Sequence, residues 1–408
     1  MTPRHVVAAL LLLPAVLVAR DHTAISQRAQ SARGTQPARE ADPGRARIAA
    51  GAAKLYDTSV LHRIDIVIAA EDVNKIPRRT TERVRCTFTI DGLTLQDVGV
   101  RQAGGVYHPY QPISNKPSLS LKFDEFVKGQ RVFNLDKLIL KNELQDRSLV
   151  NEHMSYEVLR RAGLAAPMTA HARVTINGID NGIYLMREPV DKEFLTRNFG
   201  TSYKDGNLYE IENVREFVSD PGYPALDDEG KDGRNRNDLV RFAEAIRAAT
   251  PDTFVSILSP MLDIDRFATF IAAETAIGHW DGFVYKNNNT YIYAHPKDGK
   301  YVFIPYGTDQ AFAALGTSSF GGTPRALSYL AQKFLAVPVL AERVRSEFDR
   351  ITREPVWNQQ VLMDRLDRAG RVLATADTSG RTASDVERFV SMRPAIERII
   401  RSGGPAIR

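Results

Sequence analysis

The chain has 408 residues, of which 43% are hydrophobic and 25% are charged. These values are ordinary for globular proteins, and they exclude a chain that is disordered throughout, a collagen and a coiled coil. Basic residues exceed acidic ones by 5, a mild excess without the dense lysine and arginine blocks of a nucleic-acid-binding arm, so we expect no nucleic-acid partner. The single cysteine, Cys86, excludes an intrachain disulfide and argues against a structural zinc site.

The N-terminus has the pattern of a secretory signal peptide. Arg4 and His5 precede an apolar stretch at residues 6–19, which is shorter than the roughly 20 residues that span a bilayer. We therefore expect residues 1–19 to be removed on export, leaving a secreted or extracytoplasmic protein without a stable membrane span. An uncleaved membrane anchor is the alternative, because Leu17 is larger than the residue usual at that distance from a cleavage site.

The next segment, residues 20–53, contains almost no large apolar side chains. Such a segment cannot bury enough surface to offset its ordering entropy, so we expect a flexible linker. The folded domain is then expected at residues 54–408.

This domain begins with strands and continues with helices. Periodicity and turn residues predict strands at 61–69, 86–90, 93–100, 118–123, 172–176 and 183–186. They predict helices at 148–162, 264–277, 339–351, 359–374 and 383–402. Strands in the first half and helices in the second indicate the α+β class.

Two features of the strand-rich half are suited to phosphate. Gly104 and Gly105 form a glycine pair whose backbone N–H groups can cradle an anion, although such a pair is more often only a turn. Lys116 and Lys122 are an even number of positions apart, so a strand would direct both amines to one face and toward a shared anion. The alternative for the lysines is a solvated strand edge, where they oppose aggregation.

Residues 277–312 carry the chemically informative pattern. A loop that contains Asp281 is followed by asparagines ending at Asn289, by a predicted hairpin and by a loop that contains Asp309. Because paired antiparallel strands place the residue before the first strand beside the residue after the second, Asn289 and Asp309 should converge. Amide and carboxylate oxygens, together with substrate phosphates, are ligands that magnesium prefers. Asp281 would then be free to orient or deprotonate a hydroxyl.

Such a set favours phosphoryl transfer, which needs a metal, positioning and an acceptor whose proton is removed. The alternative is structural. Successive asparagines can form a turn that tolerates left-handed backbone, and acids in loops are often solvated surface.

A longer series of motifs resembles the CotH (spore coat protein H) kinase family, secreted or surface proteins with an atypical protein-kinase-like fold. The matching runs occur in order: KPSLSLKF at 116–123, LILKNELQDRSLVNEHMSYEVLRRAGLAAP at 138–167, VTINGIDNGIYLMREPVDKEFL at 174–195, GNLYE at 206–210, HWDG at 279–282, NNTYIY at 288–293 and IPYGTDQAF at 304–312. The resemblance covers most of the chain. It implies an N-lobe-like part at about 54–190 and a C-lobe-like part at about 191–408.

The resemblance also implies roles for the residues of the hairpin segment. Asp281 matches the catalytic acid of the family's Asn/His-Trp-Asp motif, and Asn289 and Asp309 match positions suited to metal. The chain departs from the family at Tyr306 and Gly307, which replace a tryptophan and an acid. If that acid were needed for metal, the protein would be weakened or inactive.

Further roles concern the nucleotide, for which the resemblance favours Lys116 and Lys122 as phosphate-binding residues. By analogy with the lysine and glutamate pair of kinases, Glu152 would orient one lysine, although an acid in a first helical turn also suits the helix dipole. Glu188 and Asp191 fall where a hinge to the nucleotide would lie, and the family has an acid there. The resemblance therefore implies that Glu188 is a nucleotide-binding residue, although physical argument alone assigns a role to neither acid.

Together these observations predict an exported atypical protein kinase. It would transfer the γ-phosphate of ATP, with Mg²⁺ or alternatively Mn²⁺, to Ser or Thr hydroxyls of extracytoplasmic or surface proteins. The main alternative is a catalytically weak pseudokinase or a surface adhesion or structural protein on the same scaffold, which Gly307 favours. A metal-dependent hydrolase ranks last, because no His/Asp cluster that would hold two metals is evident.

Overall fold

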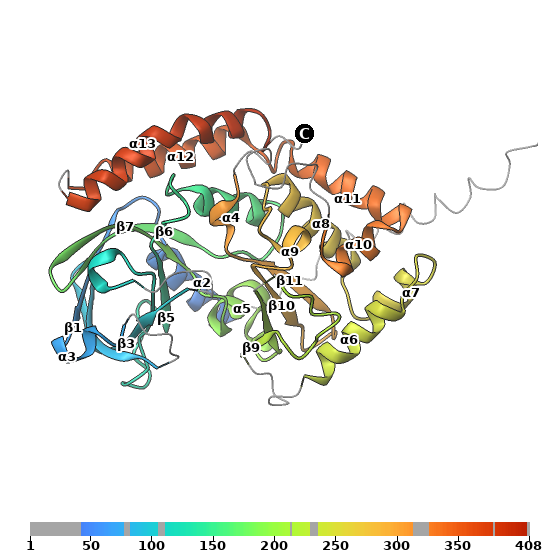
Figure 1. Ribbon diagram of the computed structural model, residues 1–408, viewed down its shortest axis with the longest axis horizontal. Coiled ribbons are helices and arrows are strands. Elements are labelled where there is room, and N and C mark those ends of the chain that lie inside the picture. The colour runs from blue at the N-terminus through green and yellow to red at the C-terminus, as the bar shows by residue number, and fades with distance from the viewer. Residues whose placement is uncertain are drawn as a thin grey trace, which may run out of the picture. The chain divides into compact units, whose positions relative to one another are not determined.

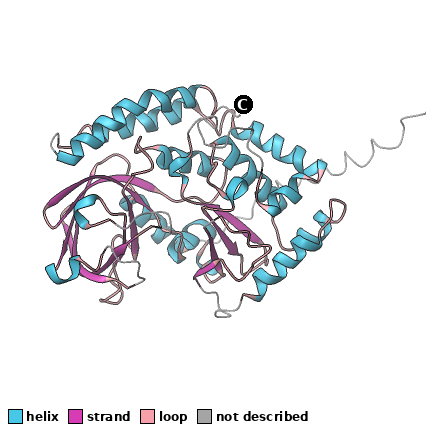
Figure 2. Ribbon diagram, viewed as in Figure 1, coloured by secondary structure: helices cyan, strands magenta, loops and turns pink. Residues whose placement is uncertain are grey.

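The computed structural model describes residues 42–76, 82–104, 111–212, 214–228, 236–312, 326–377 and 380–405. The expected signal peptide, most of the expected linker and Gly105 lie outside these residues. From Gly44 onward the chain forms one compact unit. Figures 1 and 2 show its helices and strands.

The helix α2 (Pro43–Leu55) corrects the expected extent of the linker. Ile48, Ala52 and Leu55 recur at helical spacing and are buried in the core of the barrel described below. Gly51 allows this helix a close approach, because a Cβ there would overlap the Phe133 carbonyl oxygen. The linker prediction is wrong for residues 43–53 because alanine and glycine make up much of the buried stripe and give little periodic signal.

The first half of the unit is a closed β-barrel with the strand order β1-β2-β3-β4-β5-β7-β6. Its strands are β1 (His62–Ile68), β2 (Val84–Ile90), β3 (Leu93–Gln102), β4 (Leu119–Lys122), β5 (Lys137–Lys141), β6 (Thr169–Ile176) and β7 (Ile179–Arg187). Neighbours pair antiparallel except β1 and β6, which are parallel. Alternate residues of β1, such as Ile64 and Ile66, are buried and the residues between them are exposed, so apolar side chains fill the barrel.

A second sheet has the strand order β11-β10-β8-β9. Its strands are β8 (Leu208–Ile211), β9 (Ala225–Asp228), β10 (Thr290–Ala294) and β11 (Tyr301–Pro305). Strands β10 and β11 form the predicted hairpin, with Thr290 opposite Pro305 and Ala294 opposite Tyr301. The hairpin prediction is confirmed.

Helices occur in both halves of the chain and predominate over strands in the second half. Their bounds are α3 (Ala70–Val73), α4 (Asn151–Arg161), α5 (Lys192–Phe199), α6 (Asn237–Ala248), α7 (Phe254–Leu258), α8 (Ile264–Ala276), α9 (Phe283–Lys286), α10 (Tyr329–Leu335), α11 (Pro338–Ile351), α12 (Gln359–Leu373) and α13 (Gly380–Arg401), with short 3-10 helices η1 (Ile113–Asn115), η2 (Thr201–Tyr203) and η3 (Thr308–Gln310). Helices α12 and α13 lie side by side, and α13 runs along β7 (Figure 1). The α+β class, with strands first and helices later, is confirmed.

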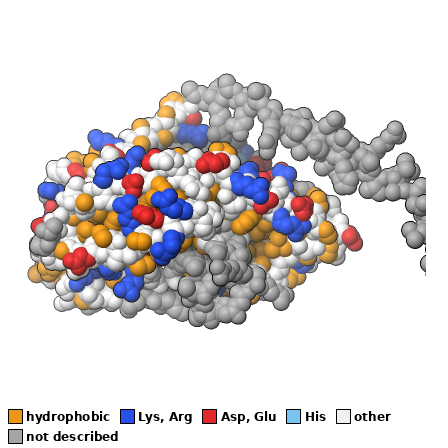
Figure 3. All heavy atoms as spheres, turned by 90° about the horizontal axis from the view of Figure 1, so that it is seen from above, with side chains coloured by type: hydrophobic (Ala, Val, Ile, Leu, Met, Phe, Trp, Pro, Cys, Tyr) orange, Lys and Arg blue, Asp and Glu red, His pale blue; other side chains and the backbone are white. Residues whose placement is uncertain are grey.

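The surface agrees with the mild charge excess. On the face seen in Figure 3, basic side chains lie among acidic and hydrophobic ones. None of the helices in the described residues has the length and apolar character needed to cross a bilayer.

Candidate active site

A cavity of about 380 Å³ lies where the barrel meets the second sheet. Residues in or beside barrel strands contribute basic and hydroxyl side chains to it, and the β10–β11 hairpin and its flanking loops contribute acids and amides. The barrel side includes Arg83, Arg101, Ser118, Ser120, Lys137, Lys141 and Arg187, and the hairpin side includes Asp281, Asn288, Asn289, Tyr306, Gly307 and Asp309. The cavity therefore combines cations and oxygen donors from distant parts of the chain.

Asn289 and Asp309 line this cavity together, as the hairpin predicts. The Tyr306 N–H donates to the Asn289 carbonyl oxygen at 3.1 Å, so the two ends of the hairpin are adjacent. Asp309 follows in η3. Asn289 has a left-handed backbone with φ 48°, which asparagine tolerates better than most residues. The residue thus forms part of a turn and also faces the cavity.

The Asp281 carboxylate is held by two neighbours. Asn289 Nδ2 donates to Asp281 Oδ2 and to the Asp281 carbonyl oxygen, each at 3.0 Å. Lys286 Nζ lies 3.2 Å from Asp281 Oδ1. The carboxylate nevertheless lines the cavity, with 13% of its side chain exposed. It is therefore oriented and accessible to a ligand.

A buried pair, formed by Glu274 of α8 and His279 in the following loop, supports the segment that carries Asp281. Glu274 Oε1 lies 3.1 Å from His279 Nδ1, and Glu274 Oε2 accepts the Val284 N–H at 2.9 Å. On its other side His279 Nε2 lies 3.3 Å from the Gly307 carbonyl oxygen. Burial alone would lower the pKa of His279, but the hydrogen bond and charge of Glu274 outweigh burial and raise it. The pair joins α8 to the loops on both sides of the hairpin.

Gly307, the position at which the resemblance to the family leads one to expect an acid, packs against Asn289. A Cβ at residue 307 would lie 2.5 Å from Asn289 Oδ1, and the backbone has φ +56°. Glycine therefore leaves this amide oxygen uncovered. Among the residues that the structure describes, no hydrogen-bond donor reaches Asn289 Oδ1.

Lys141, at the end of β5, reaches Asp309 on the hairpin side from the barrel side of the cavity. Its Nζ lies 3.3 Å from Asp309 Oδ2. Burial alone would lower the pKa of Lys141, but the Asp309 carboxylate outweighs burial and raises it. The sequence-based prediction missed Lys141, although the alternation in KLILK places Lys137 and Lys141 on one strand face, and both line the cavity.

Two fully buried acids follow Lys141 in the chain. Burial, and then the charge of Asp146, raises the pKa of Glu143 well above its ordinary value. Neither carboxylate oxygen of Glu143 has a donor in the described part of the chain. Burial raises the pKa of Asp146 to about 6. Asp309 is nevertheless the main counterion of Lys141, because its carboxylate lies 3.3 Å from the amine and is the charge that most raises the pKa of that lysine.

Glu152 is buried in α4, as expected for an orienting acid, but its partner is an arginine. Arg187 Nη1 lies 3.0 Å from Glu152 Oε1, which also accepts the Tyr156 hydroxyl at 2.7 Å. The Arg187 guanidinium stacks over the Tyr306 ring, 4.0 Å from its centroid, and donates to the Tyr306 hydroxyl. The prediction that Glu152 pairs with a lysine is therefore wrong. Its partner is Arg187, which lines the cavity.

Lys116 and Lys122, the predicted phosphate lysines, are not among the cavity-lining residues. Lys116 has φ 54° and precedes β4, so the strand face that the two lysines were expected to share does not exist. The Lys116 amine lies 2.6 Å from Asp385 Oδ2 in a buried pair, and the Lys122 amine lies 3.8 Å from Glu125. The expectation is wrong because Lys116 is paired with Asp385. That partner is 269 residues away in sequence, so local strand periodicity could not reveal it.

Of the two candidate hinge acids, only Asp191 lines the cavity. Glu188 is buried against Arg197, with a closest distance of 2.5 Å, and accepts the Met168 N–H at 2.9 Å. Asp191 begins α5 by accepting the Phe194 N–H at 3.0 Å, and burial raises its pKa well above the ordinary value. Glu188 thus joins parts of the scaffold, and Asp191 borders the site.

Known protein families provide an independent comparison. The sequence model of the family described as CotH kinase protein matches residues 101–373, more than half of the chain. The chain belongs to the CotH kinase family. The matched range includes Lys141, Asp281, Asn289 and Asp309.

Curated relatives of this CotH kinase family member carry two different descriptions. The Inner spore coat protein H of Bacillus subtilis is 25% identical over 182 residues, which are 42% of this chain and 48% of that protein. The Invasin CotH2 of Rhizopus delemar is 24% identical over 195 residues, which are 44% of this chain and 32% of that protein. The chain thus spans about half the length of the first relative and about a third of the second.

Among solved structures, the Helicobacter pylori proinflammatory kinase CtkA is similar to this chain. The match has a TM-score of 0.25 and 12% sequence identity, and it covers 70% of this chain and 94% of the other.

Proposed function

We propose that this chain is an exported protein kinase that transfers the γ-phosphate of ATP to Ser or Thr hydroxyls of extracytoplasmic or surface proteins. The observation that carries the proposal is the meeting of Asp281, Asn289 and Asp309 with Lys141 at one cavity. Phosphoryl transfer depends on positioning and charge neutralisation far more than on covalent chemistry by the protein. This set of side chains is suited to both.

The donor set fits a hard divalent cation, Mg²⁺ or Mn²⁺. Asn289 Oδ1 is uncovered beside Gly307, and Asp309 pairs with Lys141 through Oδ2, which leaves Oδ1 for another ligand. Mg²⁺ is commonly held by one or two protein oxygens together with substrate phosphates. Asn289 and Asp309 would hold the ion, which when bound would neutralise charge on the transferred phosphoryl group.

The basic side of the cavity fits the phosphates of ATP. Lys141, Arg187, Arg83 and Arg101 all line it. Arg83 directly precedes β2 and Arg101 lies in β3, which pairs with β2. Burial, and then the charge of Arg101, lowers the pKa of Arg83 to about 10. An anion between these two guanidinium groups would relieve their repulsion. We assign phosphate binding to these four residues in place of Lys116 and Lys122.

Asp281 is assigned to the acceptor hydroxyl. Its carboxylate is fixed by Asn289 and Lys286 and faces the cavity, which is the geometry that a general base or an orienting group requires. Glu152 would act indirectly by orienting Arg187, and Glu188 by supporting the scaffold.

An extracytoplasmic site of action is supported by two observations. One relative is described as a spore coat protein and the other as an invasin. The apolar stretch at residues 6–19 has the length and flanking charge of a signal peptide. We therefore expect the acceptors among exported proteins.

The test measures transfer of labelled phosphate from ATP to a panel of secreted proteins. Asp281→Asn and Asp309→Asn should each lower the rate roughly 100-fold or more, because each removes a charge next to the reacting groups. Asp298→Asn is the matched control, since Asp298 lies in the turn at the other end of the same hairpin and is 53% exposed. It should retain nearly the wild-type rate. A wild-type protein without transfer, or site variants with full transfer, would contradict the proposal.

A second function, surface adhesion on a scaffold without turnover, is favoured by Gly307 and by the relative described as an invasin. Calorimetric titration with ATP distinguishes the two. A kinase or pseudokinase should bind ATP with an affinity that depends on Mg²⁺, whereas an adhesin should show no such binding. Phosphate transfer then separates the kinase from the pseudokinase.

A further inference from the structure

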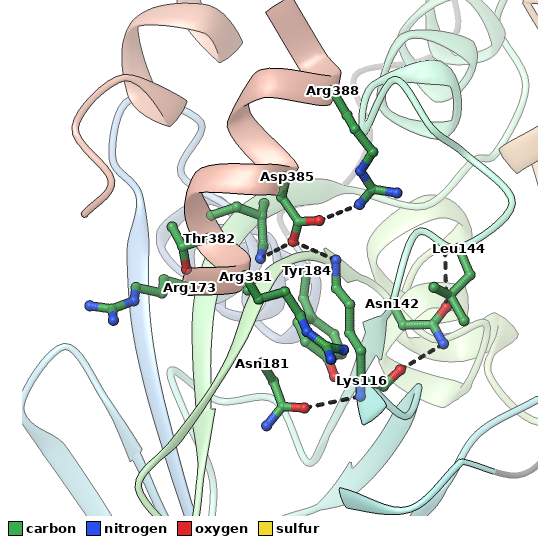
Figure 4. Close-up of polar contacts among 12 residues, drawn as sticks. Lys116, Asn142, Leu144, Arg173, Asn181, Tyr184, Arg381, Thr382, Asp385 and Arg388 are labelled. Atoms are coloured by element: carbon green, nitrogen blue, oxygen red, sulfur yellow. Dashed lines mark hydrogen bonds and ion pairs between the residues drawn. The ribbon is translucent and has the colours of Figure 1, made fainter. Parts of the chain in front are cut away.

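A buried ion pair joins the C-terminal helix α13 to the barrel. Lys116 Nζ lies 2.6 Å from Asp385 Oδ2, and only 2% and 3% of the two side chains are exposed. Figure 4 shows the lysine extending from the barrel to Asp385, whose other oxygen is contacted by Arg388. Asp385 Oδ2 also accepts the Ile183 N–H of β7 at 2.8 Å. One carboxylate thus contacts two separate segments of the barrel.

The barrel is shaped for this carboxylate at Gly182. A Cβ at residue 182 would overlap Asp385 Oδ2, and the backbone there has φ +84°, which glycine adopts without strain. The absence of a side chain at this position allows α13 to bring Asp385 against the β7 backbone.

From Lys116 a chain of hydrogen bonds leads to the cavity. The Lys116 carbonyl oxygen accepts Asn142 Nδ2 at 2.9 Å, and Ser118 Oγ accepts the Asn142 N–H at 3.1 Å. Asn142 directly follows Lys141, whose amine lies 3.3 Å from Asp309. The end of β5, which carries Lys141, is therefore held from the side of Lys116.

A buried ion pair is a costly way to join two elements, because both charges lose their water and apolar residues often pack equally well. Its best-supported use is to select one arrangement among several. Burial lowers the pKa of Lys116 and the Asp385 carboxylate opposes that effect. The pair is thus suited to fixing a position rather than to adding stability.

We propose that Asp385 is a positioning residue that acts through Lys116 and Asn142. It fixes the end of β5 and so holds Lys141 against Asp309 during phosphoryl transfer. This inference rests on the proposed kinase function. It concerns a helix beyond residue 373, where the match to the family ends.

The test compares Asp385→Asn with the matched control Asp180→Asn. Asp180 also joins α13 to β7, by accepting the Thr382 hydroxyl at 2.9 Å. We expect Asp385→Asn to lower kcat on the order of tenfold and to change KM for ATP less than about threefold, because Lys141 moves while the other phosphate-binding groups stay. Asp180→Asn should lower the melting temperature but keep kcat near the wild-type value. A wild-type kcat in folded Asp385→Asn would overturn the proposal.

Hydrogen–deuterium exchange over residues 137–145 gives a readout that does not require activity. Exchange there should be faster in Asp385→Asn than in Asp180→Asn or the wild type. If the wild type transfers no phosphate, the proposed function fails, and this measurement still decides the positioning role. Equal protection in all three proteins would overturn it.

A double-mutant cycle with Asn142→Ala tests the route. If Asp385 acts through Asn142, the double variant should lose no more kcat than the more impaired single variant, because both substitutions break the same connection. If the double variant instead lost kcat by the product of the two single losses, the connection from Asp385 through Asn142 would be overturned. Should Asp385→Asn fail to fold, Asn142→Ala decides alone, and wild-type kcat and exchange in that variant would contradict the proposal.

Discussion

At residue 307 the family motif has an acid, and this chain has a glycine beside the amide of Asn289. We predict that Gly307→Asp lowers transfer about tenfold and lowers the free energy of unfolding by about 1–3 kcal/mol, because a positive φ and the contact with Asn289 Oδ1 both oppose a side chain. Initial rates at several Mg²⁺ concentrations and thermal melts check both effects.

Gly299 provides the matched control for this substitution. It lies in the turn of the same hairpin with φ +69°, and a Cβ there would meet no atom within 4 Å. Gly299→Asp should therefore show the backbone cost without the loss of activity. A Gly307→Asp variant with tighter Mg²⁺ binding and faster transfer would instead mean that the chain lacks a needed ligand.

Substitution of the lysines at the ends of β5 and β4 should have sharply different effects on phosphate transfer. Lys141→Met is predicted to reduce transfer roughly 100-fold, because it removes the cation that pairs with Asp309 and lines the cavity. Lys122→Met should retain nearly full activity, since the Lys122 amine is 3.8 Å from Glu125 and 30% of its side chain is exposed. Steady-state kinetics with ATP as the varied substrate check the contrast. Equal losses in both variants would restore Lys122 as a phosphate ligand.

At the residue scale, the sequence was informative where function follows from local connectivity. Asn289 and Asp309 flank one hairpin, so antiparallel pairing alone predicts that they meet. The partner of Lys116 could not be predicted in this way, because Asp385 reaches it from a helix 269 residues away. The alternation of strand residues applies to Lys141 as it does to Lys116, and the cavity distinguishes the two because only Lys141 lines it.

At the scale of elements, the position of the Asp281 loop depends on the end of α8. Glu274→Gln is predicted to lower transfer about tenfold with little change in ATP affinity, because the amide removes the negative charge that His279 faces and weakens the anchor of the loop. Rates and calorimetric ATP titrations check the prediction.

Tyr285→Phe is the control for this substitution. It removes the contact between the Tyr285 hydroxyl and Thr275 Oγ1, at 2.6 Å, which also joins α8 to α9 but does not touch His279. That variant should lose some stability and keep its turnover. Loss of turnover in both variants would point to a general loosening of α8 rather than to the Asp281 loop.

Helices and strands can be predicted from the sequence where their apolar periodicity and turn residues are pronounced. The β10–β11 hairpin has alternating apolar residues and a turn at Asp298 and Gly299, and it was predicted correctly. The sequence predicts a linker over most of α2, because the stability of this helix comes from burial of a narrow stripe against the barrel and not from a strong amphipathic pattern.

At the scale of the whole molecule, β6, α4 and α12 meet at a pair of buried histidines. His171 of β6 and His153 of α4 lie with ring centroids 5.1 Å apart, and Arg365 of α12 approaches His153 Nδ1 at 3.4 Å. Burial, and then Arg365, lowers the pKa of His153, and burial lowers the pKa of His171 to about 4. Protonation of this pair would therefore oppose the packing of barrel and helices.

The pH dependence of stability follows from these directions. The folded-state pKa of His171 is depressed. The contribution of its neutral ring to the free energy of unfolding is therefore fully present above the unfolded-state pKa near 6.5, and it is lost as the pH falls toward about 4. The loss amounts to about 3 kcal/mol from His171 alone.

Urea unfolding at steps between pH 7 and pH 4.5 tests this prediction. The free energy of unfolding should decline less for His171→Gln, which keeps a donor for the Leu149 carbonyl oxygen. His295→Gln, at a half-buried ring beside Asp298, should decline almost as the wild type does. If His171→Gln instead loses stability in parallel with the wild type over this range, the histidine pair is not what makes the fold sensitive to acid.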